Sequence, residues 1–223
     1  MRSAKVRVTT VIAVVTVVAF LLARVTGLEG ALAYAAGFIP ARVAQPGLFD
    51  GAGLPLPVWP VILTPLGASL LHGGWLHIGF NMLILLYCGR QVEMVVGERL
   101  YLLLYVAGAY AAALGQWLLT PDALVPMIGA SGAISAVLGA YALLYSNSEV
   151  RSIGPVPANI VRMVWLGAGW VFLQFLIGVA SSSGPGLTGS GDKVAIGAHI
   201  GGFIAGMLLI KPMLGMRFRS RRR

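Results

Sequence analysis

The sequence is poor in charged residues, and acidic side chains are especially few. Of its 223 residues, only 10% are Asp, Glu, Lys or Arg, and seven of them are acidic. Soluble domains contain about 25% charged residues, so this composition excludes an ordinary soluble protein. The hydrophobic content of 58% and the mean hydropathy of +0.87 indicate an integral membrane protein.

Cysteine is nearly absent, which limits the covalent chemistry that is open to the chain. Cys88 is the single cysteine, so no disulfide can form within the chain. We expect Cys88 to pack as a small apolar residue.

The formal charge of +9 comes mainly from basic residues near the two ends of the sequence. Six of the sixteen Lys and Arg residues lie in 211–223, and three more lie in 2–7. Basic segments that flank apolar spans are typical of contact with anionic lipid. We therefore predict the lipid bilayer, and not nucleic acid, as the partner of this charge.

Apolar segments predict an all-α fold with six membrane-spanning helices in a single domain, residues 1–223, because one span needs about 20 apolar residues. The predicted spans are residues 8–26, 74–88, 100–119, 130–145, 160–180 and 194–214, followed by a basic tail at 215–223. The first span resembles a signal peptide in composition. No small-x-small cleavage site closes it before Arg24, so we favour a retained helix.

The distribution of basic residues predicts the orientation of these spans. With both termini in the cytoplasm, thirteen Lys and Arg residues are cytoplasmic, and only Arg24, Arg42 and Lys193 lie outside. This bias follows the positive-inside rule. It predicts a multi-pass protein of the plasma or inner membrane with both termini cytoplasmic.

In this topology the few polar residues of the spans fall near the outer face. Spans two, four and six all run from outside to inside, and their outer ends carry His72, His77 and Asn81; Ser131; and His199. Polar groups within a membrane are costly and mark functional sites. A serine with a histidine suggests a nucleophile and its general base.

Stripes of small residues could bring Ser131 and His199 together. Ser131 heads a series of small side chains at every fourth position of its span, and these lie on one helix face. His199 is followed by Gly202-x3-Gly206, a pattern typical of closely packed membrane helices. Alternatively, both stripes serve packing alone, which explains His199 less well because a buried imidazole needs a partner.

The position of Ser131 fits a structural role and a catalytic role. A serine at a helix N-terminus is typical of a cap, and the free N–H groups there can also receive an oxyanion. Gly129 and Gly132 would let a substrate backbone approach.

His77 and Asn81 lie one helical turn apart and present donors from one face. We interpret both as stabilising an oxyanion beside Ser131, and we expect His72 to orient the preceding loop. Zinc bound by the three histidines is an alternative, but no carboxylate lies nearby and Ser131 would then have no role. We therefore expect no metal.

Two long connections and one glutamate complete the pattern. Residues 28–71 are expected to fold onto the membrane surface, and residues 181–193 form a movable lid or a plain linker. Asp192 of this second connection is expected to be solvated, which leaves a Ser–His dyad. Glu93 in Glu93-x3-Gly97 is expected to form a structural hydrogen bond to a neighbouring helix.

Over residues 71–209 the sequence resembles the rhomboid intramembrane serine proteases of bacteria. The resemblance rests on the order and spacing of HGGWLHIGFN, with His72, His77 and Asn81; GASG, with Ser131; and GAHIGGFIAG, with His199, Gly202 and Gly206. The segment from Glu93 to Gly97 is similar to the end of the family's second helix.

This resemblance implies a six-helix endopeptidase that cleaves transmembrane segments of other membrane proteins and needs no cofactor. Ser131 would attack the scissile carbonyl, and His199 would serve as base and then as acid. His77, Asn81 and the Ser131 N–H would hold the oxyanion.

Two features depart from the family pattern. Rhomboids usually carry an aromatic residue four positions after the nucleophile, where this chain has Ser135. The Trp-Arg pair of the first loop is missing, since Pro60 follows Trp59. A catalytically silent relative that binds or chaperones membrane clients is therefore the alternative. A transporter is disfavoured, because the inner halves of spans two, four and six lack a polar path.

Overall fold

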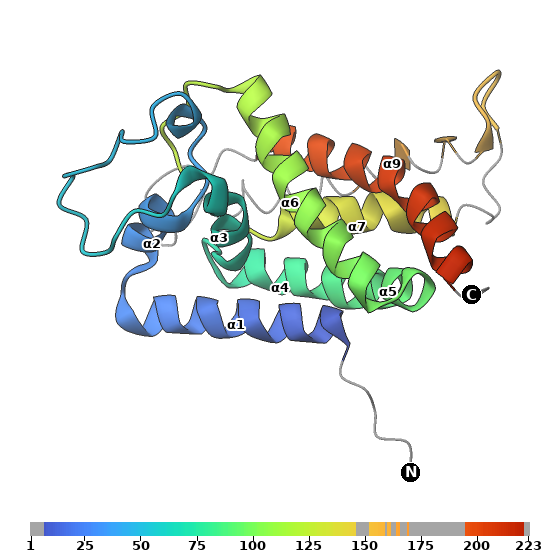
Figure 1. Ribbon diagram of the computed structural model, residues 1–223, viewed down its shortest axis with the longest axis horizontal. Helices are drawn as coiled ribbons and strands as arrows, with labels where there is room; N and C mark the ends of the chain where they lie inside the picture. The colour runs from blue at the N-terminus through green and yellow to red at the C-terminus, as the bar shows by residue number, and fades with distance from the viewer. Residues whose placement is uncertain are drawn as a thin grey trace, which may run out of the picture.

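The protein is an all-helical membrane protein, as predicted. The computed structural model describes residues 7–145, 152–158, 160–161, 164–165, 169 and 195–220 (Figure 1). Its α-helices are α1 (Val8–Thr26), α2 (Glu29–Ala36), α3 (Thr64–Leu70), α4 (Trp75–Ile84), α5 (Arg90–Val96), α6 (Glu98–Leu119), α7 (Ser131–Leu144) and α9 (Ile196–Ser220). Within these residues, β structure is limited to two isolated bridges.

The described helices account for part of the predicted membrane crossings. α1, α6 and α9 are long and apolar enough to span a membrane, and α7 is a shorter apolar helix. Segments 61–70 and 75–96 form a pair bent by 92°, which adds a fourth crossing if the pair counts as one span. The fifth predicted span and the 181–193 connection fall largely outside the described residues, so six crossings remain a prediction.

The helix over the second predicted span is longer than the apolar pattern indicated. α4, a π-helical turn at Leu85–Gly89 and α5 form one run to Val96, past the expected end at Cys88. One extra residue in a helix rotates everything that follows by about 100°. The π turn therefore sets which face α5 presents relative to α4.

α9 also exceeds its predicted span. It continues from residue 214 to Ser220, so part of the predicted basic tail is helical. Both predicted spans stop shortly before a basic residue, where the apolar pattern ends. Backbone hydrogen bonds do not depend on hydropathy, so each helix continues beyond the apolar segment.

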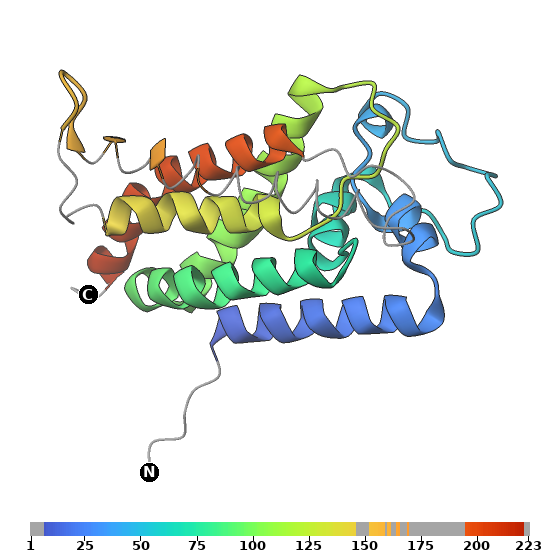
Figure 2. The same ribbon diagram turned by 180° about the vertical axis from the view of Figure 1, so that it is seen from behind.

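α7 is the central helix of the bundle and packs against α6 and α9 (Figure 2). Every residue from Ser131 to Ala140 is buried. Three glycines let α7 and α9 approach until their backbones touch. A Cβ atom at Gly202 would overlap the Gly132 carbonyl oxygen, one at Gly206 that of Ala136, and one at Gly139 that of Phe203. Small residues thus form the predicted seam between these helices.

Glu93 fastens α1 to α5. Its buried carboxylate accepts hydrogen bonds from the Val8 N–H (2.8 Å), the Thr9 N–H (2.9 Å) and the Thr9 hydroxyl (2.5 Å). A carboxylate at a helix N-terminus satisfies free N–H groups and complements the helix dipole. The expected structural hydrogen bond of Glu93 to a neighbouring helix is confirmed.

The connection between α1 and α4 holds the segment that precedes α7. Phe38 and Met127 exchange backbone hydrogen bonds of 3.1 and 2.7 Å, and the Ala41 N–H donates to the Ala123 carbonyl at 3.2 Å. This connection contains α2, α3 and two 3₁₀ turns, Pro40–Val43 and Val61–Leu63, so it is a folded unit and not an open loop.

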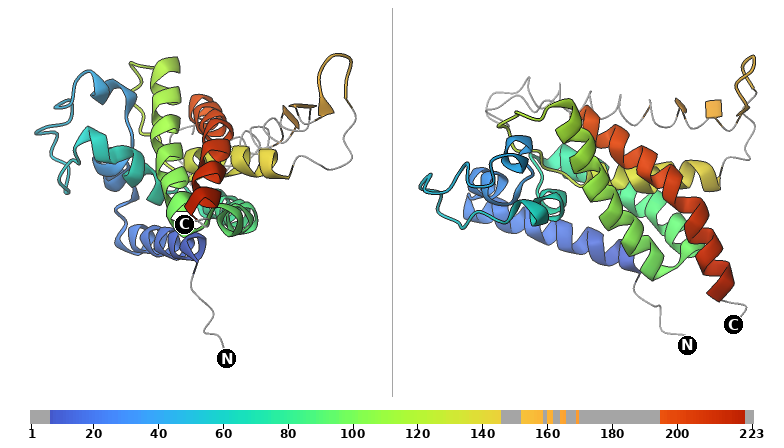
Figure 3. Two further views of the ribbon diagram at one scale, coloured as in Figure 1. Left: turned by 45° about the vertical axis from the view of Figure 1, so that its right-hand side comes forward. Right: turned by 45° about the horizontal axis from the view of Figure 1, so that its top comes forward.

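Different helix termini lie at the two ends of the bundle. The start of α1 and the end of α9 lie at the same end, and the starts of α4, α7 and α9 lie toward the other (Figures 1 and 3). Candidate catalytic residues are therefore remote from the two ends of the described chain.

We predict that Gly206→Ala destabilises the protein, because its Cβ would collide with the Ala136 carbonyl of α7. Thermal unfolding in detergent provides the measurement. Gly215→Ala on the same helix is the control, since no atom lies within 4 Å of its added Cβ. It should be neutral or stabilising by up to about 1 kcal/mol. Equal unfolding temperatures for the two variants would contradict the close packing of α7 and α9 at Gly206.

We predict that Glu93→Gln lowers the free energy of unfolding by about 2 kcal/mol, because hydrogen bonds to a charged acceptor are lost. Glu29→Gln is the matched control. Its carboxylate pairs with Arg24 at 2.9 Å on the surface, and such pairs contribute under about 1 kcal/mol. Reversible unfolding in mixed micelles measures the free energy of unfolding of the two variants. A larger decrease for Glu29→Gln than for Glu93→Gln would refute the stabilising role of the Glu93 hydrogen bonds.

Candidate active site

Ser131 and His199 meet at the starts of two adjacent helices. Ser131 is the first residue of α7, and His199 lies in the first turn of α9. The His199 Nε2 atom is 2.9 Å from the Ser131 Oγ atom, and both residues are buried. A nucleophile and a base at hydrogen-bond distance are the minimal arrangement for nucleophilic catalysis.

The Ser131 hydroxyl does not cap its own helix. Ala130 occupies the N-cap position, and its side chain forms no capping bond to α7. The simple structural role considered for Ser131 is therefore wrong. Its hydroxyl contacts His199, and its N–H is among the first four of the helix, which lack intrahelical acceptors.

Gly129 separates Ser131 from His77. Its φ of +120° is a conformation that favours glycine. A Cβ atom here would lie 2.7 Å from His77 Nε2 and 3.6 Å from Ser131 Oγ. The Gly129 N–H donates to the Ala68 carbonyl at 2.8 Å, which fixes this turn. The absence of a side chain leaves room between the two polar atoms.

His72 also reaches this turn. It is buried, its ring centroid lies 5.0 Å from that of His77, and its Nε2 accepts a long hydrogen bond of 3.4 Å from the Ala130 N–H. The sequence predicted that His72 orients the loop. The structure adds a contact with the backbone beside Ser131, which joins residues 58 positions apart and was not predicted.

Asn81 is fully buried one turn along α4 from His77. Its Nδ2 donates to the His77 carbonyl at 2.9 Å, and its Oδ1 has no hydrogen-bond partner among the described residues. Nδ2 carries two hydrogens, so a second donor remains after this bond.

Gly132 packs against α6, where its Cβ would lie 2.5 Å from that of Ala112. Its expected role in the approach of a substrate backbone stays a prediction. Gly202 and Gly206 face α7, as described above. These three glycines therefore lie where helices pack closely, and Gly129 lies near His77 Nε2 and Ser131 Oγ.

Ser135 replaces the aromatic residue usual in rhomboids. It is fully buried, and its hydroxyl donates to the Ser131 carbonyl at 2.8 Å. A Cβ added at Gly202 would lie 3.2 Å from the Ser135 Cβ, so this side chain fills the seam between α7 and α9.

Gln116 is a site neighbour that sequence reasoning missed. Its Oε1 accepts a hydrogen bond of 3.3 Å from the Ala198 N–H, adjacent to His199. A glutamine near the end of the apolar third span was the available signal. This contact ties the start of α9 to α6.

Arg42 anchors the first connection in the absence of a Trp-Arg pair. It is only 3% exposed, and its Nη2 donates to the Trp59 carbonyl at 2.8 Å. Burial lowers the pKa of the guanidinium, and nearby Asp50 opposes that shift. The Trp59 N–H donates in turn to the Ala35 carbonyl at 2.8 Å. The missing pair thus has a substitute contact.

The described residues include no group of three His, Cys, Asp or Glu side chains arranged to hold a metal ion. Asp192 and the 181–193 connection lie outside the described residues. Among the described residues, the candidate catalytic pair consists of Ser131 and His199.

Comparison with known proteins identifies the family. The sequence profile of the Rhomboid domain matches residues 58–215, which contain all the polar residues of this site. The chain belongs to the rhomboid family.

Several relatives carry protease names. The chain is 31% identical to Rhomboid protease GluP of Bacillus subtilis over 157 residues, which are 70% of this chain and 27% of the relative. It is 33% identical to Rhomboid protein 1, mitochondrial, of Saccharomyces cerevisiae over 66% of this chain and 40% of the relative. Identity to Rhomboid protease GlpG of Pectobacterium atrosepticum is 25% over 88% and 59%. The chain thus spans less than two thirds of each relative's length.

Proposed function

We propose that this rhomboid is an intramembrane serine endopeptidase that cleaves transmembrane segments of other membrane proteins. The observation that carries the proposal is the 2.9 Å contact between His199 Nε2 and Ser131 Oγ, buried at the starts of two helices. Membership in the family and the protease names of two relatives support it.

In the proposed mechanism His199 is the general base. Its neutral Nε2 accepts the proton of the Ser131 hydroxyl, which requires the tautomer with hydrogen on Nδ1. Ser131 Oγ attacks the scissile carbonyl carbon, and the protonated imidazole then gives its proton to the leaving amine. Water, deprotonated by the same nitrogen, hydrolyses the acyl-enzyme and restores the serine.

The proposed oxyanion site lies around Gly129. Its donors are the Ser131 N–H, the His77 side chain and the second Nδ2 hydrogen of Asn81. The space bounded by His77 Nε2 and Ser131 Oγ at Gly129 supports this assignment. Preorganised donors at a developing negative charge are commonly worth about 10²–10³-fold in rate.

The proposed location is the plasma or inner membrane, with both termini cytoplasmic. The start of α1 and the end of α9 share one end of the bundle, and the dyad lies toward the other (Figure 1). The excess of basic residues at that shared end supports this orientation. Cleavage is then expected near the outer boundary of a substrate helix.

We predict that the full chain in liposomes cleaves a single-span substrate, and that Ser131→Ala and His199→Ala each reduce the rate by about 10³-fold or more. Ser69→Ala is the matched control, because Ser69 is a buried serine whose hydroxyl donates to the Leu66 carbonyl. Activity that survives both dyad substitutions would refute the mechanism. A parent that is silent on several substrates would favour the client-binding alternative.

We predict that Gly129→Ala abolishes cleavage while Ser131 and His199 are unchanged, since the methyl group would enter the space beside His77 and the φ of +120° becomes strained. Gly79→Ala is the control, because nothing lies within 4 Å of its added Cβ. The cleavage rate of each variant, normalised to folded protein, is the measurement. A Gly129→Ala enzyme with parental kcat would exclude an oxyanion site here.

A further inference from the structure

A polar cavity lies at the end of the bundle remote from Ser131. This inner pocket of about 650 Å³ is formed where the start of α1, the turn between α5 and α6, and the end of α9 meet. Its charged lining residues are Arg7, Glu93, Glu98, Arg99 and Arg217. The proposed proteolysis makes no use of this pocket.

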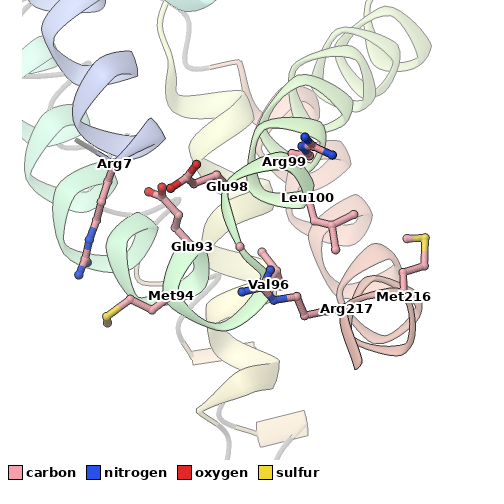
Figure 4. Close-up of a pocket in the computed structure, with 10 residues that line it drawn as sticks. Arg7, Glu93, Met94, Val96, Glu98, Arg99, Leu100, Met216 and Arg217 are labelled. Carbon is pink, nitrogen blue, oxygen red and sulfur yellow. The ribbon is translucent and has the colours of Figure 1, made fainter. Parts of the chain in front are cut away.

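Three arginines surround the inner pocket from three separate elements. Arg7 precedes α1, Arg99 belongs to α6, and Arg217 belongs to α9, as Figure 4 shows. Arg99 is exposed, and Arg7 is half-buried. Arginine suits phosphate recognition because its guanidinium forms two parallel hydrogen bonds to one group.

The Glu93 carboxylate of the pocket contacts the N-terminus of α1. Glu93 accepts three hydrogen bonds from Val8 and Thr9. Its negative charge is therefore balanced by the N-terminus of α1. The lining of the pocket thus contains three arginines and two glutamates, and helix N–H groups offset the charge of Glu93, so the lining favours an anion.

The Arg217 guanidinium lies close to the backbone of Gly97. A Cβ at Gly97 would lie 2.5 Å from Arg217 Nη1 and 2.8 Å from Cζ, so only glycine lets the guanidinium lie against this turn. Gly97 also has a φ of +85°. Glu93-x3-Gly97 thus carries two functions: Glu93 binds α1, and Gly97 admits Arg217.

The rim of the inner pocket is apolar and exposed. Met94 is 57% exposed and Met216 is 50% exposed, and both line the pocket beside the arginines. Exposed apolar side chains next to cationic ones are typical of a membrane boundary. A ligand that fits this lining has a phosphate at one end and hydrocarbon at the other.

We propose that the inner pocket binds the phosphate of an anionic glycerophospholipid from the leaflet at this end of the bundle. Basic pockets between membrane helices recognise such headgroups. Arg7 and Arg99 supply charge at the rim, Arg217 lies preorganised against Gly97, and Met94 and Met216 contact the acyl chains. Because α1, α5 and α9 all border the pocket, a bound lipid stabilises their junction.

The test is lipid binding by the full chain, measured by native mass spectrometry after titration with dioleoylphosphatidylglycerol or dioleoylphosphatidylcholine. The double variant Arg7→Gln/Arg99→Gln should bind the anionic lipid at least about tenfold more weakly, since it loses two of the three arginines that line the pocket. The matched control Arg90→Gln/Arg219→Gln loses the same charge from exposed positions that do not line the pocket. It should bind within about twofold of the parent.

Three results would overturn the proposal: equal weakening in both double variants, equal binding of the two lipids by the parent, or displacement of the lipid by millimolar inorganic phosphate. The last result would identify a free phosphate as the ligand. The single variant Arg99→Glu, at an exposed position, repeats the test if the double variant unfolds. Binding is scored without proteolysis, so the outcome is independent of whether Ser131 is catalytic.

Discussion

The close approach of the α7 and α9 backbones is the contact on which the site depends. At Gly202 and Gly206 no side chain fits between α9 and the carbonyl oxygens of α7. In a membrane, where lipid competes for apolar surface, such tight packing is a main force that joins helices. The same contact places His199 Nε2 2.9 Å from Ser131 Oγ. The glycines of α9 thus account both for the close packing of the helices and for the short distance between Ser131 and His199.

The two ends of the bundle differ in how the free N–H groups at their helix starts are hydrogen-bonded. At one end, helix starts with free N–H groups and a glycine turn leave unfilled hydrogen-bonding capacity around Ser131, as a reacting carbonyl requires. At the other end, Glu93 accepts hydrogen bonds from the first two N–H groups of α1, and the Arg7 carbonyl accepts from the next two. The π turn between these regions sets the rotation of α5 and thereby the face on which Glu93 lies. The end that carries Ser131 thus keeps free hydrogen-bonding groups, whereas Glu93 at the other end joins α1 to α5.

Much of this could be predicted from the sequence, and the exceptions have physical reasons. Polar residues are so rare in the spans that Ser131, His199 and Glu93 could be assigned to contacts directly. The contacts of Arg42 with Trp59 and of Gln116 with Ala198 could not, because they join distant segments through backbone atoms that every residue has. Hydropathy also placed the end of the second helix too early, since it measures lipid solubility and not helix length.

The central claim is that packing makes Ser131 a nucleophile through His199. Covalent labelling of the full chain by a fluorophosphonate, with the labelled residue identified by peptide mass spectrometry, tests it most directly. Our account predicts a single modified serine, Ser131, and loss of labelling in His199→Ala even though Ser131 is still present. Equal labelling of Ser131 in the parent and in His199→Ala would contradict it, because the serine would then react without its base.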